Sequence, residues 1–284
     1  MRELAGIVGR RLLLLLLTVL GAALISTLLV RLAPGFGMDE RQLDLRLSER
    51  SVAALRAGSE PPGALRSLAR LWHGDWGRSI SLGRGVRELM AERSGLTART
   101  LGAGLAIAWA AAALLCLVEL HLRRGGVELA VSLASGALLC LPAAVVALLA
   151  VNFDTGPGLA LAVVLLPRVL AYARKILRSG TCRPHVLAAF SRGIPALPLV
   201  LRHVCFPAAP ELLALAGISV GMAAGAVIPV EALYDSPGLG QLVWQSAMAR
   251  DLPVLLPLTL LIAALTCAAN LLADTARVMI CRWA

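Results

Sequence analysis

The amino-acid sequence predicts an all-α membrane protein with about six transmembrane helices. Of its 284 residues, 58% are hydrophobic, and the mean hydropathy is +0.81. Soluble domains average about 45–50% apolar residues, so a soluble domain of this size would leave too much apolar surface in water. Long uncharged runs also recur along the chain. Together these observations predict a chain that crosses a lipid bilayer several times.

Five uncharged runs have the length that a transmembrane helix requires. The hydrocarbon core is about 30 Å thick and each helical residue rises about 1.5 Å, so a span takes about 20 residues. Because lipid offers no hydrogen bonds to the backbone, such runs are expected to be helical. The runs cover residues 12–30, 100–118, 129–151, 212–230 and 252–273.

The first run follows a basic start to the chain, a combination that signal peptides share. The apolar core of a signal peptide has about 7–15 residues, which is shorter than the run 12–30. No clear small-x-small cleavage site follows that run. The sequence therefore predicts a first transmembrane helix that is retained.

A sixth, weaker run at 156–173 is interrupted by Arg168. If it is a span and the N-terminus is cytoplasmic, the short inner segments carry thirteen basic residues and the short outer ones carry only Arg250. This bias is the one that the positive-inside rule describes. Omitting the span would place the basic segment 174–202 outside. We therefore predict six spans with both termini in the cytoplasm.

The chain divides into three predicted parts. An N-terminal transmembrane helix occupies residues 1–33, and an outer loop with short polar helices occupies 34–96. A five-helix core occupies 97–284 and contains the longest cytoplasmic loop, at about 174–207. Polar helices of the outer loop are expected at about 39–58 and 86–93. Pro61-Pro62-Gly63 follows the first of them and prevents it from continuing.

Several classes of function are not indicated. A phosphate-binding GxxxxGK[ST] loop is absent and Lys175 is the only lysine, so the chain itself is not expected to bind ATP. HExxH does not occur, and the six cysteines lack metal-ligand spacing. The net charge of +10 is spread between apolar runs and forms no nucleic-acid patch. We expect no catalytic residue, no metal site and no resident cofactor.

The cytoplasmic loop contains a short amphipathic helix at 185–193. Its apolar positions Val186, Ala189, Phe190 and Gly193 follow helical spacing. Gly193 fits a C-terminal cap, and prolines at 184, 195 and 198 isolate the segment. Such a helix suits docking into a groove of a partner protein, and it suits a surface helix at the lipid interface equally well.

This helix also carries a family resemblance. Residues 187–193, Leu-Ala-Ala-Phe-Ser-Arg-Gly, resemble the EAA motif of bacterial ABC importer permeases, although Leu187 replaces the glutamate. Further segments match the first permease subunit of dipeptide, oligopeptide and nickel importers in order. They are Gly-Arg-Arg-Leu-Leu-Leu from 9, Arg-Leu-Ala-Pro-Gly from 31, Gly-Asp-Trp-Gly-Arg-Ser from 74, Leu-Arg-His from 201, Val-Glu at 230–231, Ser-Pro-Gly-Leu-Gly from 236, Ala-Arg-Asp-Leu-Pro from 249 and Asn-Leu-Leu-Ala-Asp from 270.

The resemblance implies a type I ABC importer permease fold and a set of partners. These are a second permease subunit in a heterodimer, two ABC ATPase subunits that bind ATP and Mg, and a periplasmic substrate-binding protein, all at the bacterial inner membrane. It further implies that Ala188, Ala189, Phe190 and Gly193 lie at the ATPase contact. In this family, closure of the ATPases switches the permeases between outward- and inward-facing states.

Two other groups of residues are candidates for function. Gly217, Gly221 and Gly225 form a small-residue face, which is typical of close helix packing within or between permease subunits. Glu231, Pro237 and Gly238 mark a rigid turn at the predicted outer face, and they are candidates for a periplasmic gate or a substrate contact. A plain connector explains that turn equally well.

The sequence therefore indicates the permease subunit of an ATP-driven importer for peptides, nickel or a related small solute. The alternative is a stand-alone channel or a gradient-driven carrier, which would require polar groups near the middle of the membrane. Arg168 is the charge on which that alternative depends. A membrane scaffold or sensor is a third possibility. Arg250 and Asp251 are expected to be solvated neighbours at the outer end of the last span, where surface pairs contribute little.

Overall fold

The structure is a computed structural model, and most of the residues that it describes are helical. The described residues are 9, 13, 17, 18, 20, 21, 24, 25, 28, 73–122, 125–181, 183–195 and 198–283. Within them, the β-structure consists of one isolated bridge between Arg78 and Gly85. The all-α prediction is confirmed. The polar helix predicted at 39–58 and most of the predicted first span lie outside the described residues.

Nine helical elements follow one another from residue 86 onward in the described part of the chain. They are α4 (Val86–Leu122), α5 (Gly125–Cys140), α6 (Ala143–Asn152), α7 (Pro157–Thr181), α8 (Pro184–Ser191), the π-helix η2 (Leu199–Cys205), α10 (Phe206–Leu233), α11 (Leu239–Met248) and α12 (Leu252–Trp283).

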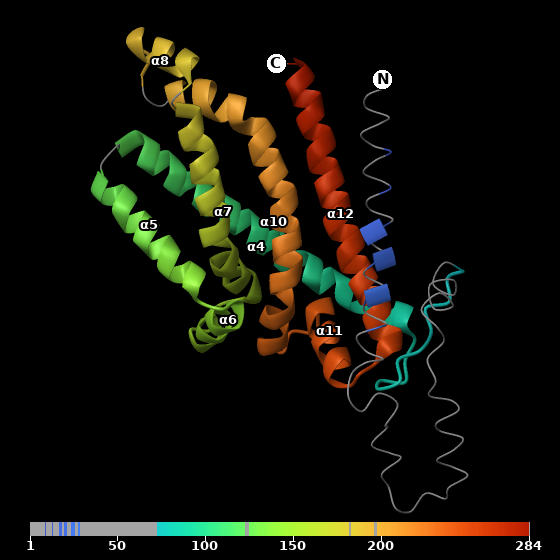
Figure 1. The fold of residues 1–284 in the computed structure, drawn as a ribbon. Coiled ribbons are helices and arrows are strands. Elements are labelled where there is room, and N and C mark those ends of the chain that lie inside the picture. The colour runs from blue at the N-terminus through green and yellow to red at the C-terminus, as the bar shows by residue number, and fades with distance from the viewer. Residues whose placement is uncertain are drawn as a thin grey trace, which may run out of the picture.

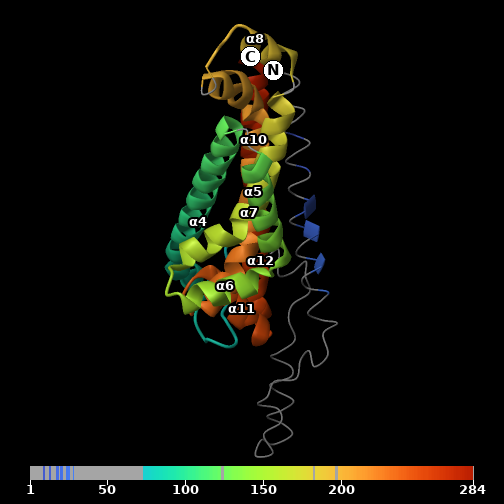
Figure 2. The ribbon, with the colours of Figure 1, turned by 90° about the vertical axis from the view of Figure 1, so that its left-hand side faces the viewer.

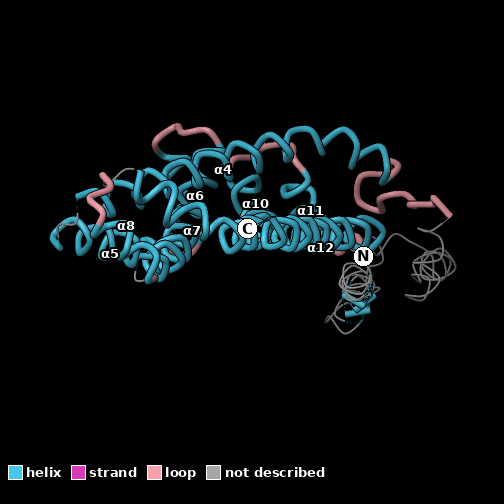
Figure 3. The backbone as a smooth tube through the Cα atoms, turned by 90° about the horizontal axis from the view of Figure 1, so that it is seen from above, coloured by secondary structure: helices cyan, strands magenta, loops and turns pink. Residues whose placement is uncertain are grey.

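The long helices form two layers. α5, α7, α10 and α12 lie in one row, and α4 crosses behind this row at an oblique angle (Figures 1 and 3). The side view shows α4 apart from the other long helices (Figure 2). The short helix α8 and the end of α12 lie at one end of the molecule, and α6 and α11 lie at the other (Figure 1). We call these the α8 end and the α11 end.

Three described helical segments are long and apolar enough to cross a membrane. They are Val86–Leu120, Leu199–Leu233 and Leu252–Ile280. α5 and α6 make a fourth if the two count as one broken span. α7 does not join them, because Arg168, Arg174, Lys175 and Arg178 interrupt its apolar sequence.

The prediction of one continuous helix at 129–151 is wrong. The segment forms two helices, α5 and α6, which are bent by 101° relative to each other. Pro142 lies at the break and precedes the first residue of α6. Proline has no backbone N–H and disfavours helical geometry at the residue before it, which here is Leu141. This X-Pro pair was visible in the sequence.

α4 is longer than the sequence suggested. The polar helix expected at 86–93 and the span expected at 100–118 form one continuous helix of 37 residues. No proline lies between them, so nothing interrupts the backbone hydrogen bonds. The boundary drawn between the outer loop and the core at 96/97 therefore falls inside α4.

α7 is the central helix of the row. Its side chains enter both large apolar clusters, since Leu161 and Leu165 pack with α6 and α10 residues, and Val169 and Leu177 pack near α8 and η2. α7 therefore joins the two large apolar clusters along its length.

Candidate functional site

The helix predicted at 185–193 is present as α8. Pro184 occupies its first turn, where the missing N–H costs nothing. Gly193 follows the helix with φ of +73°, a left-handed geometry that favours glycine, and its N–H donates to the carbonyl of Phe190 at 3.0 Å. The sequence thus isolates one short helix at the α8 end (Figure 1).

α8 has a buried side and an exposed side, and they differ from the sides expected. Val186 and Ala189 are 4% and 5% exposed and pack with Leu199 and Val204. Leu187 and Phe190 are 60% and 59% exposed, and Ala188 is exposed beside them. Ala189 therefore cannot lie on a free docking face as the sequence suggested. Helical spacing identified an apolar stripe, but only the packing shows which half of it is covered.

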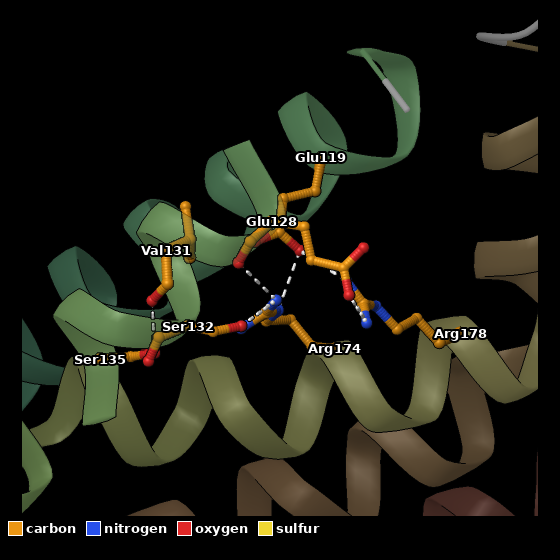
Figure 4. A network of polar contacts seen from close by, with 7 residues as sticks. All are labelled: Glu119, Glu128, Val131, Ser132, Ser135, Arg174 and Arg178. Atoms are coloured by element: carbon orange, nitrogen blue, oxygen red, sulfur yellow. Dashed lines mark hydrogen bonds and ion pairs between the residues drawn. The ribbon is translucent and has the colours of Figure 1, made fainter. Parts of the chain in front are cut away.

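A cluster of four charges joins three helices near α8 (Figure 4). The Nε of Arg174 on α7 donates to Glu119 Oε2 on α4 at 2.8 Å, and these side chains are only 10% and 6% exposed. Arg178 binds Glu128 on α5 at 2.5 Å and reaches Glu119 Oε2 at 3.7 Å. Arg174 also donates to Ser132 Oγ at 3.0 Å. The cluster holds the start of α5 against α7.

A cavity of about 430 Å³ lies between this cluster and α8. Its polar wall includes Glu119, Arg174 and Arg178, and its apolar wall includes Val186 and Val200. α8 therefore contacts the bundle mainly through η2 and the residues buried beneath it. Leu187 and Phe190 also line this cavity, so the exposed side of α8 borders it.

At the α11 end, the carboxylate of Glu231 is completely buried, at 0% exposure. Its Oε2 accepts hydrogen bonds from Thr97 Oγ1 at 3.0 Å and from the Gly240 N–H at 2.7 Å. Thr97 Oγ1 in turn accepts from the Leu239 N–H at 2.7 Å. One carboxylate and one hydroxyl thus satisfy the amides of the first turn of α11, which have no partner inside that helix.

The glycines of the predicted outer turn make this arrangement possible. A Cβ at Gly238 would lie 2.1 Å from Glu231 Oε2, and a Cβ at Gly240 would lie 2.9 Å from the same atom. The Val-Glu and Pro-Gly-Leu-Gly segments are therefore one structural unit. Glu231 and Gly238 are buried inside it, whereas Pro237 is exposed.

The glycine face of α10 is divided between two environments. A Cβ at Gly217 would lie 2.7 Å from that of Ala273, and a Cβ at Gly221 would lie 2.7 Å from Thr266 Cγ2. Both glycines thus face α12 of the same chain. Gly225 has nothing within 4 Å of its Cβ position.

Asp251 was expected in solvent, and that expectation is wrong. It is 1% exposed, and its Oδ2 accepts hydrogen bonds from Ser79 Oγ at 2.6 Å and from Ser81 Oγ at 2.8 Å. The outer loop is thus tied to the start of α12. The position before a helix, which favours Asp, was the one sequence signal for this residue. Arg250 does remain exposed.

Comparison with known proteins adds independent information. The sequence profile described as binding-protein-dependent transport system inner membrane component matches residues 104–283. A putative peptide permease protein of Brucella suis is 26% identical, with 95% of this chain and 96% of the relative covered. A putative peptide transport system permease protein of Brucella abortus is 25% identical over 73% and 74% of the two chains. The oligopeptide transport system permease protein OppB of Escherichia coli is 36% identical over 28% of this chain and 26% of its own.

Proposed function

Because this chain belongs to the family of binding-protein-dependent transport system inner membrane components, we propose that it is one of two permease subunits of an ATP-driven peptide importer. The partner permease would be a different chain, so that the two form a heterodimer. Two ATPase subunits would bind ATP and Mg, and a periplasmic binding protein would deliver the substrate. The α8 end would face the cytoplasm, together with both termini, in the bacterial inner membrane.

Peptides are the preferred substrate class because of the relatives' names. Those named above are a peptide permease, a peptide transport permease and an oligopeptide permease. Nickel, which the motifs left open, has no support from these names. The stand-alone carrier is also disfavoured, because the family is a component of a binding-protein-dependent system.

The exposed side of α8 is the observation that carries this proposal. Leu187 and Phe190 expose 60% and 59% of their surfaces at one end of the molecule, on a helix whose buried residues are Val186 and Ala189. An exposed aromatic anchor on a helix is well suited to fill a groove of a partner. We assign this groove to an ATPase subunit, with Ala188 allowing close approach, Ala189 supporting α8 from beneath and Gly193 shaping its end.

Co-purification tests the assembly directly. The tagged chain is expressed with its neighbouring genes, extracted in mild detergent, and everything retained with it is identified by mass spectrometry. A second permease and ATPases with phosphate-binding loops should be recovered. A homogeneous species that contains this chain alone would contradict the proposal and bring back the carrier alternative.

A substitution at the end of α8 tests the coupling role. Gly193→Trp forces a side chain into left-handed backbone geometry, and it should uncouple ATP hydrolysis from uptake while the complex still assembles. Ser191→Ala, an exposed position of the same helix, is the matched control. Equal coupling in both variants would exclude Gly193 from the ATPase contact.

We also propose that α11 is the outer gate, held closed by Glu231 and Gly238, with Pro237 at its exposed lip. Arg93 on α4 donates to Gln245 on α11 at 3.5 Å, which gives a place to test this. In a background without the six native cysteines, Arg93→Cys and Gln245→Cys would be bridged by a short bifunctional thiol reagent. Bridging should block uptake, and either single variant treated with the same reagent should not.

A further inference from the structure

The charges of α7 fall on two sides of the helix with opposite surroundings. Arg174 and Arg178 turn toward α4 and α5, where Glu119 and Glu128 neutralise them. Arg168 and Lys175 are exposed, and neither makes a hydrogen bond or ion pair with any described residue. α7 contains no acidic residue that could neutralise them.

The unpaired charges lie on one strip of the helix. Residues 168, 172 and 175 are spaced i, i+4 and i+7, so they lie on the same side. Tyr172 is 55% exposed. Ala171 is also exposed on this side, and Ser179 extends the strip toward the α8 end. We call Arg168, Ala171, Tyr172, Lys175 and Ser179 the cationic strip.

Arg168 marks the place where this side of α7 changes from covered to open. One and two turns toward the α11 end, Leu161 and Leu165 are 0% exposed and Val164 is 7% exposed. Toward the α8 end, the strip is exposed. The predicted span 156–173 would place the first residue of α7 at one surface of the hydrocarbon core. Arg168 follows that residue by about 16 Å of helix rise, so it would lie near the middle of a core about 30 Å thick.

A charge at that depth requires a polar environment. Charged side chains within membrane spans almost always face a water-filled cavity or the interior of a bundle, and they mark substrate paths. Lys175, about 10 Å further along, would lie nearer the inner surface. A strip with cationic groups at these two levels attracts anions and repels metal cations.

We propose that the cationic strip lines the translocation path and that Arg168 binds the carboxylate of the transported substrate. This inference rests on the proposed importer function and deepens it, because it limits the substrate to solutes with an anionic group, such as peptides with a free C-terminus. Arginine is suited to this role, since its planar fork of donors matches a carboxylate. Bare nickel ions do not fit such a path.

A paired peptide library tests this assignment. The assembled importer is reconstituted in proteoliposomes and given short peptides, each with a free and an amidated C-terminus in equal amounts. Mass spectrometry measures the ratio of free-acid to amidated peptides taken up. Dividing it by the same ratio for peptides bound to the binding protein alone removes selection by that protein and gives the acid-to-amide uptake ratio. We expect the unmodified importer to favour acids about tenfold, as a charge-assisted hydrogen bond implies.

Four variants separate a specific contact from a structural one. Arg168→Gln should bring the ratio close to one, and Arg168→Lys should retain most of the preference. Lys175→Gln should lower it to a smaller extent. Arg277→Ala, which removes an exposed arginine of α12, should leave it unchanged.

Each outcome decides between defined alternatives. If Arg168→Gln lowers the uptake of acids and amides equally, Arg168 pairs with an acidic residue of the partner permease and the inference is wrong. If the ratio does not change, Arg168 faces lipid headgroups and the inference is also wrong. An importer that takes up no peptide of the library, although ATP is hydrolysed, would instead contradict the proposed peptide function.

Discussion

The buried carboxylates have different partners at the two ends of the molecule. At the α11 end, single carboxylates are enclosed, as with Glu231 at 0% exposure and Asp251 at 1%, and one oxygen of each accepts hydrogen bonds from a backbone amide and from hydroxyls. At the α8 end, Glu119 is neutralised by arginine side chains, and these arginines also reach the half-exposed Glu128. The first arrangement depends on backbone positions and resists small movements. The second depends on long side chains that can rearrange.

The difference indicates what each end is built to do. α11, α10 and α4 are tied together by Glu231 and Thr97, which holds the α11 end together in the state where the proposed gate is closed. α8 is held by two buried side chains, by the hydrogen bond between His185 and the carbonyl of His203, and by the ion pair of Arg183 with Glu211, and it keeps its larger apolar side chains exposed. A permease needs both properties, since motion that begins at a partner ATPase must reach the opposite end. The predictions below test this contrast.

The largest effect is expected for Gly238→Ala. The new Cβ would lie 2.1 Å from Glu231 Oε2, so the carboxylate must leave the Gly240 amide or α11 must move. Overpacking and a lost buried hydrogen bond together should lower the free energy of unfolding by about 4 kcal/mol or more. Denaturation of the detergent-solubilised chain measures this. Gly225→Ala, with nothing within 4 Å, is the control, and equal losses in both variants would refute the contact with Glu231.

A smaller but substantial decrease in the free energy of unfolding is expected for Glu119→Gln. This change leaves Arg174, at 10% exposure, without its neutralising partner, and breaking such a buried pair costs about 3 kcal/mol. Glu88→Gln is the matched control, because Glu88 pairs with Arg84 in solvent at 66% exposure and exposed pairs contribute little. If both variants unfold at the same denaturant concentration, the cluster near α8 does not stabilise the bundle.

Thr97→Val should lower the free energy of unfolding by a still smaller amount, about 2 kcal/mol. The substitution keeps the side-chain shape but removes one donor to Glu231 and the acceptor of the Leu239 N–H, which leaves buried polar groups without partners. A double-mutant cycle with Glu231→Gln measures how strongly the two residues are coupled. Additive losses would show that α4 and α11 are not joined through this pair.

The smallest change in stability, under about 0.5 kcal/mol, is expected for Phe190→Ala, because this side chain is 59% exposed. Its effect should appear in the assembly instead, as binding to the ATPase weakened about tenfold or more. Affinity measurements in detergent compare it with Val186→Ala, whose side chain is 4% exposed and should affect stability first. A Phe190→Ala variant that binds the ATPase normally would move the docking surface elsewhere.

Much of the fold could be predicted because the membrane limits the choices. Long uncharged runs must be helices in lipid, and the structure places helices on four of the five such runs, with the break at Pro142 in one of them. α8 was anticipated within two residues at its C-terminal end, since prolines and a glycine delimit it. These signals are local, so they can be read without knowledge of the neighbours.

The candidate sites were predicted less completely, because they depend on contacts between distant segments. Glu231 was noticed, but its partner Thr97 lies on another helix. Asp251 was assigned to solvent because nothing nearby in the sequence shows that Ser79 and Ser81 cover it. The pairing of Glu119 with Arg174 was missed, since 55 positions separate the two residues.

The sequence by itself determined the helical membrane class, the isolation of α8 and the resemblance to importer permeases, because composition, proline positions and motifs act locally. Only the tertiary structure decided which side of α8 and of α7 is covered, and which carboxylates are enclosed. A residue becomes buried through neighbours that are far away along the chain. Helical periodicity can identify a stripe of residues, but packing alone decides whether that stripe meets the core, a partner or the path of the substrate.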